Sequence, residues 1–359
     1  MISSEYPLDR DYLNRDVNPS PCPEMKRPMT FLALGTIAVL LGSEFLLQQV
    51  FGLGRPLLYR ADPHTGYRVA PNQKLRRFGN RIQINQFSMR NAPISPTRSA
   101  ETLRILMLGD SLVNGMVWTD QAQTLTALVQ SNLEQKVATA SPEAIVPQGI
   151  EVLNVAAGSW GPRNELAYLQ QFGTFQSQIL ILVLNTDDFF GAPPRPEVVG
   201  RDPNYPDRNP LGAWAEVFQQ LWRRLPLPSA WGSSWGLQRP PLPPLPKEKD
   251  VIDINLKAIE AIYTLTQAEG MQFFVVLSPL RRELAQEGGS RDYEKTLRQR
   301  FQDWADQHQV AVLDLLPLFN AHPTPLTLFS DHIHLSSVGN QEVAAAIVQR
   351  LQTQKFLDF

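Results

Sequence analysis

Between Arg104 and Leu351 the chain alternates short apolar runs with longer amphipathic stretches, and this alternation limits the possible folds more than any other feature. The apolar runs lie at 104–108, 150–156, 179–185, 271–277 and 310–316. They are apolar at nearly every position, which is typical of parallel strands buried on both faces. The stretches between them have the length and period of helices. The pattern predicts a three-layer α/β/α sandwich with about five parallel strands, in which ligands bind beyond the carboxyl ends of the strands.

The composition excludes several classes of function. The 359 residues are 43% hydrophobic and 19% charged, so the chain can bury a sizeable core. The net charge is -2 and no long Lys/Arg run occurs, so we expect no nucleic-acid partner. Cys22 is the only cysteine, which excludes an intrachain disulfide and any C-x-x-C metal or redox motif. We expect no cofactor.

The apolar residues at 28–52 predict a transmembrane helix, since about 20 residues of helix cross the hydrocarbon core of a bilayer. A cleaved signal peptide is disfavoured because the polar lead is long and no A-x-A-like site follows. A buried core helix stays open as an alternative because of Glu44, whose carboxylate would be costly at the bilayer centre. We expect an uncleaved single-pass anchor. The flanking basic residues slightly favour an extracytoplasmic domain.

The remaining domain boundaries follow from composition. Residues 1–27 lack an apolar period and predict a disordered tail, and residues 53–100 predict a linker with a small β-hairpin around Gly79 and Asn80. Residues 101–359 form the main domain, which is interrupted by a Pro/Trp-rich insertion at 189–250.

Inside the insertion, the period of residues 211–224 predicts an amphipathic helix, and PPLPPLP predicts polyproline II. The insertion also holds Trp214, Trp222, Trp231 and Trp235. Packing against the domain, a substrate-stacking lid and an interfacial membrane contact all remain open for these tryptophans.

The segment RILMLGDSLVNG carries the strongest chemical signal, because a buried strand runs directly into Gly109, Asp110 and Ser111. The nucleophile turn of an α/β-hydrolase requires G-x-S-x-G. Here Val113 occupies the position of the second glycine, so that fold is disfavoured. A serine hydroxyl must lose a proton as it attacks, so a base held by a third group is required.

Two of the five histidines lie in LFSDHIHLSSVGN, between the last strand and the last helix. Together, the GDS segment and the D-x-x-H segment resemble blocks of the GDSL, or SGNH, hydrolase superfamily. The resemblance implies a flavodoxin-like sandwich and the roles of nucleophile for Ser111, base for His334 and orienting acid for Asp331. A metal site at His332, His334 and Asp331 is the alternative, but no further cluster completes a ligand set.

The same resemblance implies an oxyanion hole, formed by the donors that stabilise the negative oxygen of the intermediate. It assigns the backbone N–H groups of Ser111 and Gly158 to this hole. The family usually has a G-x-N-D pattern after the third strand, whereas this chain has Asp187 at the Asn position. Two alternatives stay open: Asn185 supplies the amide through a local bulge, or a protonated Asp187 donates.

The sequence therefore predicts a membrane-anchored serine esterase that acts on a small-molecule or carbohydrate ester through an acyl-serine intermediate, for example by deacetylating a carbohydrate. An O-acyltransferase to a glycan would use the same residues. A non-catalytic binding or assembly protein that retains the fold is the third reading, and Asp187 is its main support. The substrate and the oligomeric state do not follow from the sequence.

Overall fold

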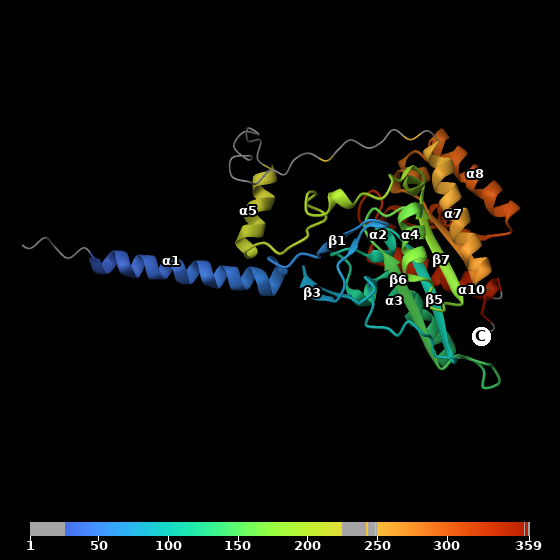
Figure 1. The fold of residues 1–359 in the computed structure, drawn as a ribbon, viewed down its shortest axis with the longest axis horizontal. Coiled ribbons are helices and arrows are strands. Elements are labelled where there is room, and N and C mark those ends of the chain that lie inside the picture. The colour runs from blue at the N-terminus through green and yellow to red at the C-terminus, as the bar shows by residue number, and fades with distance from the viewer. Residues whose placement is uncertain (1–25, 225–241, 243–247, 249, 355, 358–359) are drawn as a thin grey trace, which may run out of the picture. The chain divides into compact units, whose positions relative to one another are not determined.

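The computed structural model describes residues 26–224, 242, 248, 250–354 and 356–357 (Figure 1). The predicted tail up to residue 25, the polyproline stretch apart from Leu242, Trp231 and Trp235 lie outside the described residues. The chain has two compact units, Met1–Phe45 and Leu46–Phe359.

The described part of the N-terminal unit is helical: α1 (Lys26–Leu46) ends at the first residue of the second unit, and one π-helical turn, η2 (Leu47–Phe51), follows it. Residues Phe31–Phe51 have a mean hydropathy of 1.7 and are long and apolar enough to cross a membrane. A signal sequence near an N-terminus has the same properties. None of this segment is buried, so it does not resemble the core helix of a soluble protein.

A five-stranded parallel sheet forms the centre of the larger unit, with the strand order β6-β5-β7-β8-β9. The strands are β5 (Thr102–Gly109), β6 (Gly149–Ala156), β7 (Ile179–Asn185), β8 (Gln272–Ser278) and β9 (Ala311–Asp314). Because successive side chains of a strand point to opposite faces, each strand contributes to two hydrophobic cores. Leu106 and Leu108 of β5 face one core, whereas Ile105 and Met107 face the other.

Helices cover both faces of the sheet (Figure 1). On one face α3 (Leu125–Ala138) packs against α10 (Ser337–Thr353). The other face carries α4 (Pro162–Phe172), α7 (Val251–Ala268) and α8 (Asp292–Gln307). The predicted α/β/α sandwich is thereby confirmed.

Smaller elements surround this sandwich. Two antiparallel hairpins precede it, one of β1 (Tyr59–Asp62) and β2 (Gly66–Val69) and one of β3 (Gln73–Arg77) and β4 (Asn80–Ile84). The short helices are α2 (Ser111–Asn114), α5 (Ala213–Arg224), α9 (Leu315–Ala321), η3 (Gln121–Gln123), η4 (Thr186–Phe190), η5 (Pro196–Val198), η6 (Arg281–Glu283), η7 (Ala285–Glu287) and η8 (Pro325–Leu328).

The strand order reverses between β5 and β7. The chain leaves β5 for β6 on one side, and returns to place β7 and then β8 on the other side. Connections that run in opposite directions open a crevice at the carboxyl ends of the two strands, where open α/β sheets bind ligands. Ser111 follows β5 and Asn185 ends β7, so both lie at this crevice.

Candidate active site

Ser111 is the first residue of α2, directly after β5. The turn needs a glycine at position 109, because a Cβ there would lie 2.7 Å from Val113 Cγ2 and 2.9 Å from the Val183 carbonyl oxygen. Asp110 caps the helix by accepting a hydrogen bond from the Leu112 N–H at 2.8 Å. The sharp passage from strand to helix leaves the Ser111 hydroxyl at the end of the sheet.

The loop between η8 and α10 holds Asp331 and His334 in a fixed relative orientation. One carboxylate oxygen of Asp331 accepts the backbone N–H groups of Ile333, at 2.9 Å, and His334, at 2.7 Å. The other oxygen lies 2.7 Å from His334 Nδ1. On the far side of the ring, Nε2 lies 2.9 Å from the Ser111 hydroxyl oxygen. The structure therefore brings the three predicted residues into one continuous chain of hydrogen bonds.

The surroundings keep Asp331 ionised. Partial burial raises the pKa of its carboxyl, but the N–H of Ile333, the His334 ring and the His334 N–H lower it by more, so the pKa falls below its ordinary value. An ionised carboxylate requires a donor at Nδ1, so a neutral His334 has its proton there and Nε2 is free to accept from Ser111.

His332, the third residue of the alternative metal site, does not join this group. Its side chain is 78% exposed, and its Nδ1 lies 3.9 Å from Asp331. Across the described parts of the chain, no group of three His, Cys, Asp or Glu side chains has the arrangement of a metal site.

Asp110 is the neighbour of Ser111 in the site and is buried. Burial raises the pKa of this carboxyl to about 6, although the Leu112 N–H and the His334 charge oppose the rise. One of its oxygens lies 3.5 Å from the Ser111 hydroxyl and accepts a hydrogen bond from the Asn185 amide at 3.1 Å. Asp110 thus links the end of β5 to the end of β7.

Asn185 is 1% exposed and begins the turn that follows β7. Its side-chain oxygen accepts the N–H of Asp187 at 2.8 Å, and its own N–H donates to the Asp188 carboxylate at 2.7 Å. These reciprocal bonds form a capping box. The amide nitrogen has two hydrogens, of which the bond to Asp110 uses one.

Asp187 has a different environment. Its side chain is 51% exposed and lies 3.4 Å from Arg282. Of the hydrogen bonds among described residues, none joins Asn185 or Asp187 to Ser111. The protonated Asp187 of the sequence analysis would require a dry pocket, and this carboxylate instead faces solvent and a cation.

Gly158 follows β6 at the same edge of the sheet. Its carbonyl oxygen accepts a hydrogen bond from the Tyr67 hydroxyl at 2.8 Å. A Cβ at this position would lie 2.9 Å from the Met116 methyl group. Within the described residues, the Gly158 N–H donates to no acceptor. The peptide is held in place and has an uncommitted donor.

Two further carboxyl groups are buried behind Asp110. Burial, and next the Asp110 charge, raise the pKa values of Glu165 and Asp188 well above the ordinary value of each group. Glu165 is 0% exposed, and both of its carboxylate oxygens lack a hydrogen-bond partner among the described residues. An unpartnered buried carboxylate is costly when ionised, so this region favours the protonated form.

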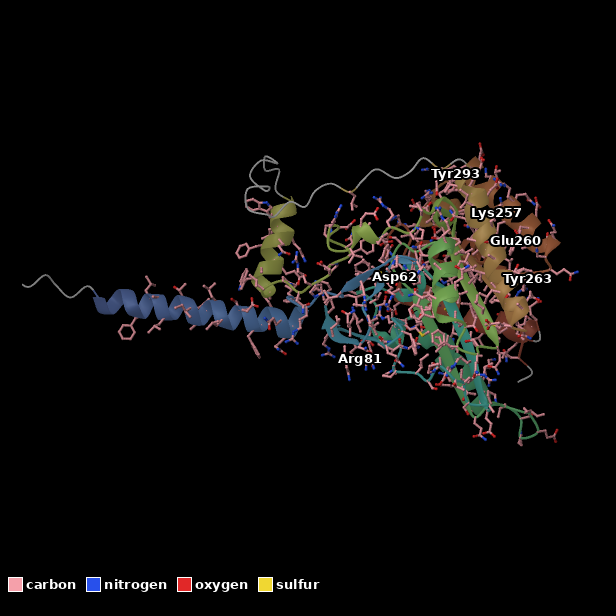
Figure 2. All side chains as sticks on the ribbon, in the orientation of Figure 1. Asp62, Arg81, Lys257, Glu260, Tyr263 and Tyr293 are labelled. Carbon is pink, nitrogen blue, oxygen red and sulfur yellow. The ribbon has the colours of Figure 1, made fainter. Side chains whose placement is uncertain are left out.

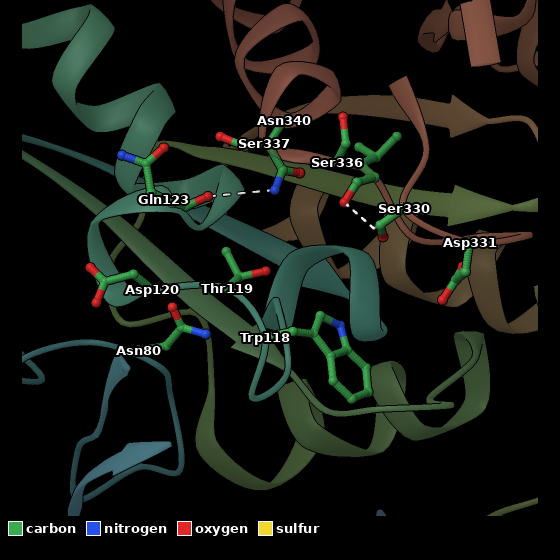
Figure 3. Close-up of a pocket in the computed structure, with 11 residues that line it drawn as sticks. Asn80, Trp118, Thr119, Asp120, Gln123, Ser330, Asp331, Ser336, Ser337 and Asn340 are labelled. Carbon is green, nitrogen blue, oxygen red and sulfur yellow. Dashed lines mark hydrogen bonds between the residues drawn. The ribbon is translucent and has the colours of Figure 1, made fainter. Parts of the chain in front are cut away.

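A cavity of about 480 Å³ opens beside the catalytic candidates, with Trp118 and Asp331 in its wall (Figure 3). The Trp118 side chain is 55% exposed, and its ring lies edge-on to the His334 ring, with 5.8 Å between centroids. Apart from Leu335, the other lining residues are polar, among them Asn80, Asp120 and Asn340. The cavity thus combines an exposed aromatic ring with hydrogen-bonding groups.

Part of the wall of this cavity comes from the β3–β4 hairpin, which precedes the sandwich in the chain. Asn80 belongs to the β3–β4 hairpin and donates to the Val117 carbonyl oxygen at 3.1 Å. The next residue, Arg81, pairs with Asp120, with 2.7 Å between Arg81 Nη2 and Asp120 Oδ1. Figure 2 labels Arg81 among the side chains drawn on the ribbon. The hairpin is therefore tied to the loop that supports Trp118.

Sequence reasoning missed two members of this site. Asp110 lies within the GDS segment, directly before Ser111, and no other feature of the sequence marks it. Trp118 has no motif, and only its position a few residues after Ser111 could have suggested a role.

The fold and the site define a class: α/β proteins with a Ser–His–Asp arrangement at the carboxyl edge of a parallel sheet. A family model narrows the class. The GDSL-like lipase/acylhydrolase family matches residues 107–342, and the chain belongs to this family of ester-hydrolysing enzymes. The suspected GDSL/SGNH membership is confirmed.

Solved structures include similar folds at low identity. The acetyl xylan esterase AlAXEase is 14% identical, with 69% of this chain and 98% of that chain covered and a TM-score of 0.41. Axe2, an acetylxylan esterase from Geobacillus stearothermophilus, is also 14% identical, with 69% of this chain and 94% of that chain covered and a TM-score of 0.42. A lipase/acylhydrolase from Enterococcus faecalis is 14% identical, with 70% of this chain and 96% of that chain covered and a TM-score of 0.39. A search of curated proteins finds no match to the chain.

Proposed function

We propose that the chain is a serine esterase in which Ser111 forms an acyl-enzyme intermediate, with His334 as base and Asp331 as the group that orients it. The observation that carries the proposal is the bonded series from Ser111 Oγ to His334 Nε2, at 2.9 Å, and from His334 Nδ1 to Asp331, at 2.7 Å. These distances lie within the range that an activated nucleophile requires.

In the proposed reaction the Ser111 oxygen attacks the ester carbonyl carbon as its proton passes to His334 Nε2. The imidazolium is stabilised by Asp331 and then protonates the departing alcohol, which leaves the acyl group on Ser111. Water, activated by the same histidine, attacks the acyl carbonyl and releases the acid. Each proton taken by His334 in one step is returned in the next.

For the oxyanion we propose three donors: the backbone N–H groups of Ser111 and Gly158, and the second amide hydrogen of Asn185. Asn185 suits this role better than Asp187, because it is buried, donates to the neighbour of Ser111 and retains an uncommitted N–H, whereas Asp187 is half exposed and faces Arg282. Donors fixed before the reaction stabilise the developing charge most effectively.

We further propose that the ester belongs to a carbohydrate, deacetylation being the simplest case. Sugars present apolar C–H faces and many hydroxyls, and the cavity beside His334 offers both an exposed Trp118 ring and polar side chains such as Asn80 and Asn340. Transfer of the acyl group to a sugar hydroxyl would use the same intermediate.

The proposed organisation keeps the boundaries given by the sequence. Residues 28–52 anchor the chain in a membrane as a single-pass helix, residues 53–100 connect it to the hydrolase domain at 101–359, and that domain lies outside the cytoplasm. The length and apolarity of Phe31–Phe51 support the anchor.

The test is hydrolysis of p-nitrophenyl acetate by the full chain in detergent, comparing wild type with Ser111→Ala. We expect the variant to lose at least about 10³-fold in kcat/KM, because it has no nucleophile. Ser141→Ala, at an exposed serine in the loop before β6, is the matched control and should hydrolyse the ester like the wild type. Equal rates for wild type and Ser111→Ala, with both proteins folded, would refute the proposal.

A further inference from the structure

The segment Gly52–Gly54 immediately follows the apolar run Phe31–Phe51, and parts of the second unit that are far away in sequence surround it. Arg77 donates to the Gly52 carbonyl oxygen at 2.9 Å, and the Phe78 N–H donates to the Phe51 carbonyl oxygen at 2.9 Å. A Cβ at Gly52 would lie 1.9 Å from the Arg76 carbonyl oxygen. The β3–β4 hairpin is therefore packed directly against the end of the apolar run.

Helix α5 of the insertion is fixed to the same segment. Glu216 accepts the Gly54 N–H at 2.7 Å and forms a buried ion pair with Arg77, in which the Arg77 Nη1 to Glu216 Oε2 distance is 3.0 Å. A Cβ at Gly54 would lie 3.0 Å from the Ala213 nitrogen. Helix α5 also contacts η2, the last turn of the apolar run. The buried ion pair defines where this helix lies within the second unit.

The opposite face of α5 exposes large apolar side chains. Phe218 and Leu221 lie three residues apart, so they share one side of the helix, while Glu216 points to the other side. Their exposed fractions are 63% and 51%, and Leu211, just before the helix, is fully exposed. At the tip of the hairpin Phe78 is 51% exposed as well. Exposed apolar groups thus gather around the end of the apolar run.

Cations lie on the hairpin that carries Phe78 and directly after Gly54. Arg55, Lys74 and Arg76 are exposed and line a cavity of about 900 Å³ together with Arg81. Arg76 and Arg81 are directly opposite each other in the hairpin, where like charges repel, and the ion pair of Arg81 with Asp120 offsets this repulsion. Between Arg55 and Arg98 the sequence has nine basic residues and one acidic residue, in a chain whose net charge is -2. An anionic partner would complement this local excess of positive charge.

We propose that this surface, formed by Phe78, Leu211, Phe218 and Leu221 with Arg55, Lys74 and Arg76, binds the headgroup region of an anionic bilayer. Interfacial helices bury aromatic and aliphatic side chains at the boundary of headgroups and acyl chains, and juxtamembrane cations bind acidic lipids. A lipid surface fits better than another protein because the surface surrounds the point where the predicted membrane helix ends. The proposal rests on α1 as the membrane anchor.

The surface would hold the hydrolase domain at the membrane instead of leaving it on a free tether. The buried pair of Arg77 and Glu216 would then act as a brace, since it joins α5 to the hairpin and to the segment after the anchor. The insertion, which the sequence left between core packing, a lid and a membrane contact, would have the third role.

The experiment uses the full chain reconstituted in nanodiscs. Cys22→Ser removes the only native cysteine, and Leu221→Cys then carries an NBD label whose quenching by spin-labelled lipid is measured. Ile145→Cys, at a position 92% exposed in a distant loop, is the matched control. We expect at least about threefold stronger quenching at position 221 than at 145, because interfacial side chains lie within about 10 Å of the acyl chains. Replacing Arg55, Lys74 and Arg76 by Gln should weaken quenching in anionic discs and leave it unchanged in neutral ones.

Equal, weak quenching at both positions in correctly inserted protein would overturn the proposal. A blue-shifted but unquenched label at 221 would also overturn it, because it would mean that another protein copy covers the surface. Failure of the chain to enter nanodiscs would instead refute the anchor, on which the proposal depends. Hydrolysis of a soluble ester by each labelled variant reports separately on the fold and on the proposed esterase.

Discussion

Two loops at the carboxyl edge of the sheet, one before α10 and one after β7, contain residues that the sequence predicts for the site. The two loops differ in the direction in which their aspartate side chains point. In the loop before α10, Asp331 accepts two N–H groups of its own loop and faces His334, which faces Ser111. In the loop after β7, Asp188 closes a capping box inward, and Asp187 faces outward to Arg282. The amide that donates to Asp110, the neighbour of Ser111, belongs to Asn185.

The difference shows that a motif position does not determine which side chain reaches a site. A capping box fixes the β7 loop so that the residue at the usual family position is turned away, while a residue two positions earlier lies near the site. The mismatch at Asp187, which in the sequence argued for a non-catalytic protein, carries less weight once Asn185 is seen at the end of β7.

The loop before α10 should show the largest effect. Asp331→Asn replaces an acceptor by a donor at His334 Nδ1, which favours the wrong tautomer and removes the charge that stabilises the imidazolium. We expect kcat/KM to fall by about 10³- to 10⁴-fold. His332→Ala, in the same loop but 78% exposed, is the control and should retain activity. A fall of less than about tenfold for Asp331→Asn would leave no catalytic role for the pair.

For the β7 loop, Asn185→Ala should give the next largest effect. The change removes the proposed oxyanion donor and a buried hydrogen bond to Asp110. We expect kcat to fall by about 10²-fold, as for loss of one such donor. The thermal midpoint is measured in parallel, and activity is compared at a temperature where both proteins are folded. Full activity in folded Asn185→Ala would mean that the oxyanion hole consists of the backbone N–H groups of Ser111 and Gly158 alone.

Glu165→Gln tests the buried acids behind the β7 loop. The pKa of Glu165 is raised in the folded protein, so between its ordinary pKa and this raised value the folded state binds more protons than the unfolded state. Wild-type stability must then fall as pH rises through that window, and the variant lacks this contribution. We expect the free energy of unfolding of the variant, relative to wild type, to rise by about 1.4 kcal/mol per pH unit there. Urea titrations at several pH values measure both free energies of unfolding. If the difference between variant and wild type does not change with pH, the raised pKa of Glu165 is contradicted.

Asp187→Asn should have the smallest effect. Its side chain is 51% exposed and its partner Arg282 also contacts Glu294, so the ion pair contributes less than about 1 kcal/mol. We expect kcat/KM to change by less than about threefold, because the side chain of residue 187 does not contact Ser111. The change also restores the usual family residue, so a large gain in activity would show that position 187 does reach the oxyanion and that the contrast between the loops is wrong.

The sequence was sufficient for the sandwich, because five apolar strands and the helices between them follow from the apolar period alone. It also indicated Ser111, which directly follows a strand, and Asp331 and His334, which lie three residues apart in one loop. It did not indicate Asp110 or Trp118, because burial of the first and the contact of the second with His334 depend on packing between elements distant in the chain. The choice between Asn185 and Asp187 depended on loop hydrogen bonds that no periodicity encodes.

The central claim is that Ser111 is the nucleophile, and covalent labelling tests it most directly. The protein is treated with diethyl p-nitrophenyl phosphate, whose phosphorus a catalytic serine attacks with loss of p-nitrophenolate, and the adduct is located by peptide mass spectrometry. The account predicts a diethylphosphoryl group on Ser111, formed in step with loss of esterase activity and absent from His334→Ala. Full activity after complete labelling of Ser111, or inactivation with the adduct on another residue, would contradict it.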